Sequence, residues 1–447
     1  MKSLKEINEY IENNKDSVSQ KYRLKYHMMP PVGWMNDPNG LVFHNGAYHL
    51  FYQANPFKTL PGVMHWGGFL SSDLITYSDL NVRIAPTKDY DNIFSGGALS
   101  DNGVLKILYT VHHEKDGLKT ETINYRDSVD GISFSDERVV FSNESLPKGY
   151  SRNDFRDPSP YKIGDDYYCF IGGKKDATNE GVIIVLKGKR LDCLTYFFTI
   201  GPFYELGDMG ECPSYVHLPD YDLLIASGCH VKRRNNDFKN ENSSLFILGH
   251  LDFVKGKMDI EKIQEIDKGD TFYAPQFING SQKPVMIGWM EMWGKPYPLH
   301  EMKAGWNGAF TIPRIVTIRN GEIYQQPISS LENYYCQKET NAFDLSYQAL
   351  RGSILTVKGT NGSFTISLDD YLSLDTNDAN NLNGQIRRTN HKYEKVNVRL
   401  LVDTSSVEIF VNDGLETITS RHYLDGPLKI ISNAFVKELK IHYIEVN

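Results

Sequence analysis

Gly33-Trp34-Met35-Asn36-Asp37-Pro38-Asn39-Gly40 places one carboxylate, Asp37, between a side-chain amide and a proline. Pro38 fixes its own φ angle and disfavours the helical region for the residue before it, so we expect Asp37 in an extended conformation at a strand end or a turn. The last four residues are all common in turns, so a plain turn is the alternative interpretation. A carboxylate on a backbone restricted in this way can be aimed in one direction.

The same arrangement recurs along the chain. Arg156-Asp157-Pro158-Ser159 and Glu211-Cys212-Pro213-Ser214 each place an acid at or next to a proline, and Tyr273-Ala274-Pro275-Gln276 keeps the proline without the acid. Phe94-Ser95-Gly96-Gly97 interrupts another strand-like run with small residues. With residues 38, 96, 158, 213 and 275 as markers, the gaps are 58, 62, 55 and 62 residues, which indicates a repeat.

Short strands with period-two alternation run from Leu41 to about residue 325, as in Tyr48-His49-Leu50-Phe51-Tyr52-Gln53. His44-Asn45-Gly46-Ala47 is typical of a hairpin turn. Such strands in regular units predict an all-β fold, a five-bladed β-propeller of four-stranded blades. In a propeller the innermost strands converge on one axis, so acids far apart in sequence would face one pocket. A β-sandwich could supply the strands but would not require the repeat.

The chain divides into four predicted parts. Leu4, Ile7 and Ile11 have helical spacing and predict an amphipathic helix that extends to about residue 22. After the propeller a short linker precedes a second all-β part, which is typical of a two-sheet sandwich and contains the hairpin signal Asn412-Asp413-Gly414. The predicted parts are an N-terminal helical segment (1–24), the five-bladed propeller (25–328), a linker (329–334) and the β-sandwich (335–447).

Composition excludes several classes of function. The formal net charge of −8 comes with no basic stripe, which argues against a nucleic-acid partner. No apolar run approaches the roughly 20 residues that span a bilayer, and the N-terminus shows no secretion signal, so we expect no membrane partner. The five cysteines are widely spaced and odd in number, which is typical of reduced thiols in a cytoplasmic protein. The histidines lack metal-binding spacing such as HExxH, and we expect neither a metal nor a cofactor.

Three convergent carboxyl groups suit the cleavage of a glycosidic bond. One acid protonates the leaving oxygen, and another attacks or stabilises an oxocarbenium-like centre. In the retaining version the two groups lie roughly 5–5.5 Å apart and one forms a covalent intermediate. Like charges at that range raise one pKa and keep that group protonated as the acid.

The run from Tyr26 to Gly40 resembles the signature of glycoside hydrolase family 32, which contains invertases, fructanases and sucrose-6-phosphate hydrolases. The segment Asp403 to Gly414 is similar to the second domain of that family, and the resemblance extends from about residue 25 to the end. Its other motifs follow in order: Phe51-Tyr52-Gln53, His65-Trp66-Gly67, Phe94-Ser95-Gly96, Arg156-Asp157-Pro158, Glu211-Cys212-Pro213 and Phe272-Tyr273-Ala274-Pro275-Gln276.

The resemblance implies a role for each acid: Asp37 as the nucleophile on the anomeric carbon of a fructosyl unit, Glu211 as the acid/base, and Asp157 as the group that holds fructose hydroxyls. The residues implied to line the fructose pocket are Asn36, Gln53, Trp66, Phe94, Ser95 and Arg156, with Tyr273 and Trp289 near the acid/base. Each has a plainer alternative: the Arg156 and Asp157 pair could be a salt bridge, and Trp66 or Phe94 a core aromatic. Cys212 is more simply a packing residue, because no histidine is placed to activate it.

The implied substrate is a small sugar. Gly288-Trp289-Met290-Glu291-Met292-Trp293 is similar to the branch that hydrolyses sucrose 6-phosphate, so we expect that sugar and sucrose as substrates. Pro61 and Gly68 replace large side chains of many relatives and predict an altered pocket rim. Candidate phosphate-binding cations are Lys232, Arg233, Arg234 and Lys303. The alternatives are a β-fructofuranosidase for unphosphorylated sucrose or short fructooligosaccharides, and a non-catalytic sugar-binding propeller.

Overall fold

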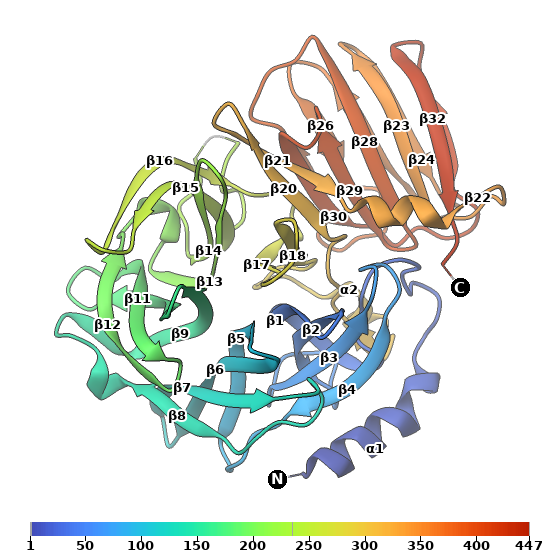
Figure 1. The fold of residues 1–447 in the computed structure, drawn as a ribbon. Helices are drawn as coiled ribbons and strands as arrows, with labels where there is room; N and C mark the ends of the chain where they lie inside the picture. Colours follow the sequence, from blue (N-terminus) through green and yellow to red (C-terminus); the bar gives the residue numbers. More distant parts are fainter. Residues whose placement is uncertain (1, 235, 447) are drawn as a thin grey trace.

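The computed structural model describes residues 2–234 and 236–446, which form seven β-sheets and only short helices (Figure 1). Five of these sheets come from residues 33–327 and two from residues 335–444. The all-β prediction is therefore confirmed.

The first five sheets follow one another along the chain, and within each sheet neighbouring strands are antiparallel, apart from one short parallel strand described below. The first contains β1 (Gly33–His44), β2 (Ala47–Asn55), β3 (His65–Ser71) and β4 (Ser78–Ile84). The second contains β5 (Asp91–Asp101), β6 (Val104–Lys115), β7 (Leu118–Ser128) and β8 (Arg138–Ser142). The third contains β9 (Tyr150–Ile163), β10 (Asp166–Lys175), β11 (Glu180–Arg190) and β12 (Cys193–Ile200). The fourth contains β13 (Met209–His217), β14 (Asp222–Cys229), β15 (Ser243–Asp252) and β16 (Lys257–Glu265), and the fifth β17 (Tyr273–Phe277), β18 (Val285–Trp289), β20 (Arg314–Arg319) and β21 (Glu322–Pro327).

The five sheets close into a ring around their first strands (Figure 1). Strand β1 contacts β5, β5 contacts β9, β9 contacts β13, β13 contacts β17, and β17 contacts β1 again. One further strand, β19 (Trp306–Asn307), leaves the fifth sheet and pairs in parallel with the start of β1, where Gly33 lies opposite Trp306. Residues from the end of the ring therefore complete its first sheet.

Each of the five innermost strands contains a bulge, at which two residues interrupt the pairing with the next strand. The interrupting residues are Asn36–Asp37, Phe94–Ser95, Asp157–Pro158, Cys212–Pro213 and Ala274–Pro275. Asp157, Cys212 and Ala274 have positive φ angles of 62°, 46° and 48°. A bulge turns a side chain away from its ordinary direction, and proline is tolerated there because its missing N–H needs no partner. The recurring motif of the sequence is thus the recurring bulge of the fold.

Gln276 joins three innermost strands just after the bulges. From β17, its side-chain Nε2 donates to the Gly96 carbonyl at 3.1 Å, and its Oε1 accepts from the Leu41 N–H at 2.9 Å. Both backbone groups lie in strands, β5 and β1, that are remote in sequence. One buried amide therefore helps to hold the centre of the ring.

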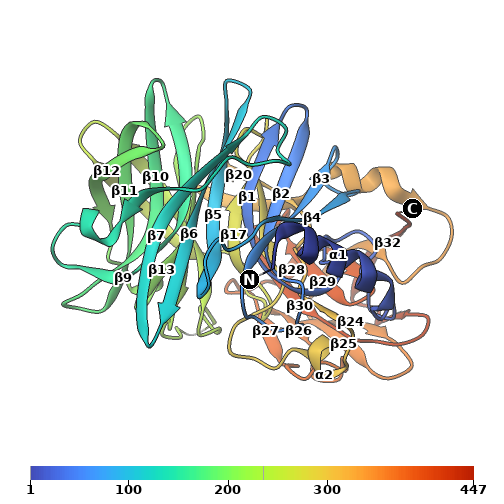
Figure 2. The ribbon, with the colours of Figure 1, turned by 90° about the horizontal axis from the view of Figure 1, so that it is seen from below.

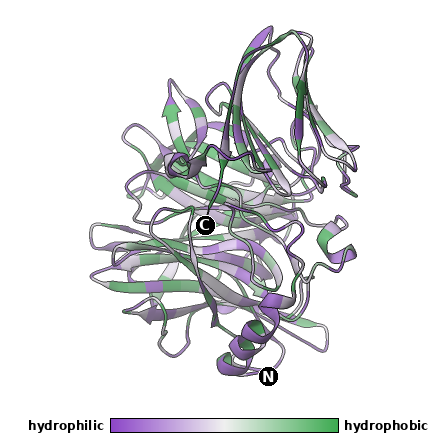
Figure 3. Cartoon of the chain, turned by 90° about the vertical axis from the view of Figure 1, so that its right-hand side faces the viewer, coloured by the Kyte–Doolittle hydropathy of each residue, from purple (hydrophilic) through white to green (hydrophobic). Residues whose placement is uncertain are grey.

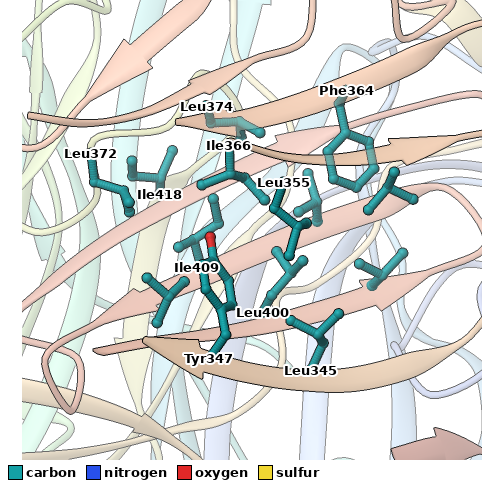
Figure 4. Close-up of a cluster of buried hydrophobic side chains, with 14 of the residues drawn as sticks. Leu345, Tyr347, Leu355, Phe364, Ile366, Leu372, Leu374, Leu400, Ile409 and Ile418 are labelled. Carbon is teal, nitrogen blue, oxygen red and sulfur yellow. The ribbon is translucent and has the colours of Figure 1, made fainter. Parts of the chain in front are cut away.

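Residues 335–444 form two sheets that pack face to face. The first sheet contains, in order, β22 (Tyr335–Cys336), β32 (Val436–Ile444), β23 (Phe343–Leu350), β28 (Lys395–Asp403), β29 (Ser406–Val411) and β30 (Glu416–Arg421). The second contains β27 (Ile386–Arg388), β26 (Leu372–Asp375), β25 (Ser363–Leu368), β24 (Ser353–Lys358) and β31 (Lys429–Ser432). Leu345, Leu400 and Ile409 of the first sheet meet Leu355 and Ile366 of the second in a buried core (Figure 4). Apolar and polar residues alternate along these strands (Figure 3), as a sandwich requires.

The N-terminal helix is shorter than predicted. Helix α1 (Leu4–Asn14) and the turn η1 (Lys15–Ser17) end before residue 22. Beyond them Ser19 pairs with Ala304 and accepts a hydrogen bond from Trp306, so contacts with the ring determine the backbone there instead of helical periodicity. The helix lies against β4 (Figure 2), where Asn8 bonds the backbone of Val82.

The remaining helical elements are short: η2 (Asn143–Ser145), η3 (Tyr204–Leu206), α2 (Pro298–Glu301) and η4 (Ser329–Tyr334). The last of these connects the fifth sheet to β22. Within residues 2–234 and 236–446, no helix has the length and apolar character needed to cross a membrane.

A buried ionic network joins the two parts of the chain. Arg314 of β20 is fully buried, and its guanidinium donates to Asp267 at 2.9 Å and to Glu408 of β29 at 2.6 Å. Burial alone would lower the pKa of His27, but its hydrogen bonds to Asp403 at 2.8 Å and Glu408 at 2.9 Å outweigh burial and raise that pKa. These hydrogen bonds therefore favour the cationic form of His27.

Candidate active site

Side chains at or beside the first four bulges line one cavity of about 250 Å³. Asp37 of β1, Asp157 of β9 and Glu211 of β13 all line it. The three acids are remote in sequence, and the ring brings them together. The complete lining is Asn36, Asp37, Gln53, Pro61, Gly62, Met64, Phe94, Ser95, Arg156, Asp157, Glu211 and Trp293.

Asp37 is held by hydrogen bonds on both carboxylate oxygens. Asn36 Nδ2 donates to Oδ1 at 3.1 Å, and the Ser95 hydroxyl donates to Oδ2 at 2.7 Å. Asn36 is itself fixed by the indole N–H of Trp34, which donates to its side-chain oxygen at 2.6 Å. The carboxylate thus has a fixed orientation, as a nucleophile needs.

Asp157 lies next to Cys212. The backbone N–H of Cys212 donates to Asp157 Oδ2 at 2.9 Å, and the Cys212 thiol lies 3.5 Å from both Asp157 Oδ2 and Asp37 Oδ2. Burial and the neighbouring carboxylates raise the thiol pKa well above its usual value. Cys212 therefore stays protonated and bridges two acids, which agrees with its interpretation as a packing residue and not a nucleophile.

Glu211 accepts hydrogen bonds from two side chains, Arg156 and Tyr273. Arg156 donates to Glu211 Oε1 through Nε at 3.0 Å and Nη2 at 2.7 Å. The Tyr273 hydroxyl donates to Oε2 at 2.7 Å. These bonds orient the carboxylate toward the cavity that it lines together with Asp37.

The three acids differ in their electrostatics. Burial, followed by the charge of Glu211, raises the pKa of Asp157 to about 7, and burial also raises the pKa of Asp37. Burial would raise the pKa of Glu211 as well, but Arg156 and Tyr273 outweigh it and the pKa falls. Burial and the charge of Glu211 thus favour the protonated form of Asp157, although the resemblance implies that Glu211 is the acid.

The structure brings most of the predicted pocket residues to the cavity. Asn36, Gln53, Phe94, Ser95 and Arg156 line it. Three others lie behind its wall. Trp66 is fully buried and donates to the Phe94 carbonyl at 3.0 Å, Tyr273 touches Glu211 from outside the cavity, and Trp289 is fully buried beside Trp34.

Sequence reasoning missed two lining side chains, Met64 and Trp293. In the sequence, Trp293 is only the last residue of the run that begins at Gly288. The indoles of Trp289 and Trp293 lie 4.7 Å apart, and Trp293 extends the aromatic wall outward to the cavity. Met64 immediately precedes the motif His65-Trp66-Gly67, and this position was the only signal for it in the sequence. Pro61 forms part of the lining, whereas Gly68, the other residue predicted to alter the rim, lies in β3 outside the lining.

The predicted phosphate-binding cations do not line this cavity. Arg234 is paired with Glu205 at 2.8 Å and lies over the ring of Tyr204. Lys232, Arg233 and Lys303 are exposed. Among the residues that the structure describes, no group of three or more His, Cys, Asp or Glu side chains is arranged to hold a metal ion.

Buried carboxylates converging on one sugar-sized cavity, with hydrogen-bond donors and aromatic rings around them, define a site of the glycoside-hydrolase type. Residues 27–327 match the model of the glycosyl hydrolases family 32 N-terminal domain, and residues 329–444 match that of the family 32 C-terminal domain. The chain belongs to glycosyl hydrolase family 32.

Curated relatives include a sucrose-6-phosphate hydrolase of Escherichia coli, 32% identical over 89% of this chain and 88% of the relative. A raffinose invertase of Escherichia coli is 30% identical over 89% of each chain. Among solved structures, the family 32 β-fructofuranosidase BmSUC1 of Bombyx mori is 28% identical with a TM-score of 0.87, covering 99% of this chain and 98% of that one. These neighbours support a propeller-plus-sandwich architecture.

Proposed function

We propose that this protein is a retaining glycosidase that releases fructose from sucrose 6-phosphate and from sucrose. The observation that carries the proposal is the convergence of Asp37, Asp157 and Glu211 on one cavity. We also propose that the five sheets of residues 25–328 are the blades of a five-bladed propeller, followed by a linker (329–334) and a sandwich (335–447). The segment 1–24 packs on the outside of the first blade.

In the proposed first step an oxygen of Asp37 attacks the anomeric carbon of the fructosyl unit. The bond to the leaving oxygen breaks as Glu211 gives that oxygen its proton. In the second step Glu211 takes a proton from water, whose oxygen attacks the same carbon and breaks the ester to Asp37. Fructose leaves and Glu211 carries its proton again. Asp157 holds fructose hydroxyls and stabilises the positive charge of the transition state.

Glu211 needs a proton that Arg156 disfavours in this structure. Sugar hydroxyls near Arg156 would accept hydrogen bonds from its N–H groups and so weaken its pairing with Glu211. The proton on Asp157 could then pass to Glu211, because the two groups share one cluster. This sequence of events gives Arg156 two roles, in binding the fructosyl unit and in setting the charge of the acid.

Sucrose 6-phosphate is preferred in the proposal because curated relatives with that activity align over most of this chain. Such a substrate arises where sucrose is phosphorylated during uptake, so we propose a cytoplasmic location. The second candidate, a β-fructofuranosidase for unphosphorylated sucrose or short fructooligosaccharides, is favoured by the likeness to the raffinose invertase and to BmSUC1.

The test is a comparison of kcat/KM for sucrose 6-phosphate, sucrose and a short fructooligosaccharide. A higher value for the phosphorylated sugar is expected. Equal values for both forms of sucrose would favour the second candidate, and release of fructose from none of the three donors would contradict any glycosidase.

The roles of the acids are tested by Glu211→Gln and Asp37→Ala. We expect Glu211→Gln to lower kcat on sucrose by about 10²–10⁴-fold and to spare a fructoside whose leaving group needs no proton, because only protonation is lost. Asp37→Ala should inactivate the enzyme on both donors, since no covalent intermediate can form. If both variants respond alike to the leaving group, the roles assigned here are wrong.

A further inference from the structure

A group of cations lies where the two parts of the chain meet beside the cavity. Lys295 Nζ donates to the Asp270 carbonyl at 3.0 Å and lies 3.5 Å from Asn240 Oδ1. Arg387 of β27, in the sandwich, donates through Nη2 to the same Asn240 oxygen. Lys239 is the neighbour of Asn240 in the chain. Lys295 and Arg387 thus approach the same asparagine from two segments, and Lys239 lies near enough to Arg387 for their charges to interact.

These cations lack the acidic partners that other buried cations of this protein have. Arg314 and Arg156 each pair with carboxylates, whereas none of Lys239, Lys295 and Arg387 has a carboxylate oxygen within 4.0 Å in the described part of the chain. Arg387 is only 2% exposed, and its buried Nε has no hydrogen-bond partner among the described residues. A buried donor without a partner is costly, so the arrangement favours an added acceptor.

Positive charge accumulates around this group. Burial, and then the charges of Arg387, Arg233 and Arg388, lower the pKa of Lys239. Burial likewise lowers the pKa of Lys295, and the charge of Arg387 adds to the effect, while the nearby carboxylates of Asp270 and Glu291 oppose it. An anion placed among these side chains would offset the repulsion between the cations.

None of these cations lines the catalytic cavity, but two of the segments that carry or bind them lead directly to it. Trp293 lines the cavity, and Lys295 follows on the same segment after Gly294. On the other side, the Asp270 carbonyl that binds Lys295 precedes Tyr273, whose hydroxyl contacts Glu211. The sandwich closes over this segment, since Asn383 Nδ2 donates to the Pro296 carbonyl at 2.7 Å.

We propose that Lys239, Lys295 and Arg387, with Arg233 beside them, bind the phosphate group of a phosphorylated sugar whose fructosyl unit occupies the cavity. The inference rests on the proposed function. A phosphate supplies several acceptor oxygens and close to two negative charges, and so matches a set of unpaired lysine and arginine donors. Of the four cations that the sequence indicated, only Arg233 belongs to this group. The sandwich thereby contributes a residue to substrate selection.

The test measures kcat/KM for sucrose 6-phosphate and for sucrose in the wild type, Lys239→Gln and Lys239→Gln/Arg233→Gln. The ratio of the two values should fall about tenfold in Lys239→Gln, because one charge-assisted hydrogen bond is lost, and further in the double variant. Lys303→Gln, which removes an exposed lysine outside the group, is the control and should keep the wild-type ratio. Thermal unfolding of each variant shows that it is folded.

Inorganic phosphate separates substrate binding from a regulatory site. We expect phosphate to compete with sucrose 6-phosphate and to lose this effect in Lys239→Gln. A wild-type ratio retained in both variants would overturn the inference. The inference would also fail if phosphate changed the rate of sucrose hydrolysis in the wild type and the variants lost this effect while they kept the wild-type ratio of kcat/KM values. Absence of fructose release by the wild type would instead count against the proposed function.

Discussion

The charge of Arg156 acts to lower the pKa of two acids of the cavity, Glu211 and Asp157. Its guanidinium donates twice to one oxygen of Glu211 and lies 3.5 Å from Glu121, so one cation faces acids on two sides. A planar guanidinium can move from a carboxylate to sugar hydroxyls while it keeps its charge. The distribution of protons among the acids therefore depends on what Arg156 contacts.

The pH profile of sucrose hydrolysis tests this dependence. In the proposed mechanism the active form needs Asp37 ionised and one proton shared by Asp157 and Glu211. Loss of that proton sets the alkaline limb of kcat/KM, and the pKa of Asp157 is raised to about 7. Arg156→Gln removes the nearby positive charge, so the cluster should hold its proton more tightly. We expect the alkaline limb to move upward by about one to three pH units.

Arg156→Lys keeps a positive charge and is the matched control, for which a smaller movement is expected. Sucrose is the appropriate substrate because it carries no phosphate that titrates in this range. An alkaline limb at the same pH in wild type and Arg156→Gln would show that another group controls it.

Among the elements, the innermost strands were the most predictable from sequence. A bulge needs residues that accept an interrupted ladder, and Pro158, Pro213 and Pro275 mark that place in three strands. This requirement is local, so the positions of the bulges could be predicted from the sequence. It also identified the three acids, because each lies at or beside such a bulge.

Other features depend on tertiary contacts and could not be predicted. Whether Trp66 or Trp293 faces the cavity is decided by neighbouring sheets, and the sequence selected the buried indole and omitted the lining one. Lys295 and Arg387 come close only because the sandwich packs against the ring. The end of α1 is likewise determined by contacts with residues 304–306.

The link made by Gln276 predicts a measurable contribution to stability. Gln276→Leu keeps a side chain of similar size but leaves the Leu41 N–H and the Gly96 carbonyl without their partner. A buried polar group without a partner costs about 1–3 kcal/mol, so we expect the free energy of unfolding in urea to fall by about 2 kcal/mol or more. Gln282→Leu changes an exposed glutamine in the connection between β17 and β18 and should have little effect. Equal stability of the two variants would contradict the role of Gln276.

At the scale of the whole molecule, the ring and the sandwich share a network of buried charges. Asp267 and Arg314 come from the ring, Asp403 and Glu408 from the sandwich, and His27 from the segment that precedes β1. Removing one member of a buried ion pair leaves its partner uncompensated. We therefore expect the two parts to unfold together.

Arg314→Met tests this coupling. The variant leaves Asp267 and Glu408 buried without their cation, and the free energy of unfolding should fall by about 3–5 kcal/mol. Arg319→Met is the control on the same strand. Its guanidinium is 3.7 Å from Asp413 of the sandwich and about half exposed, so we expect a loss of about 0–1 kcal/mol. Similar losses in denaturant unfolding of the two variants would argue against the network.

His27 gives the network a dependence on pH. Because its pKa is raised in the folded protein, the stabilisation is fully present below the usual histidine pKa of about 6.5 and is lost as the pH rises through the raised value. The difference in Tm between wild type and His27→Gln should therefore be larger at pH 6 than at pH 9. A difference that does not change with pH would show that His27 is neutral.

The parallel pairing of β19 with β1 has a consequence for how the protein is made. Trp34, which fixes Asn36 beside Asp37, lies opposite Asn307 in this pairing. During synthesis on the ribosome the first catalytic strand emerges long before the segment that completes its sheet. The nascent chain must therefore keep residues 33–34 unpaired on that side until the ring is nearly finished, and catalytic competence comes late in translation.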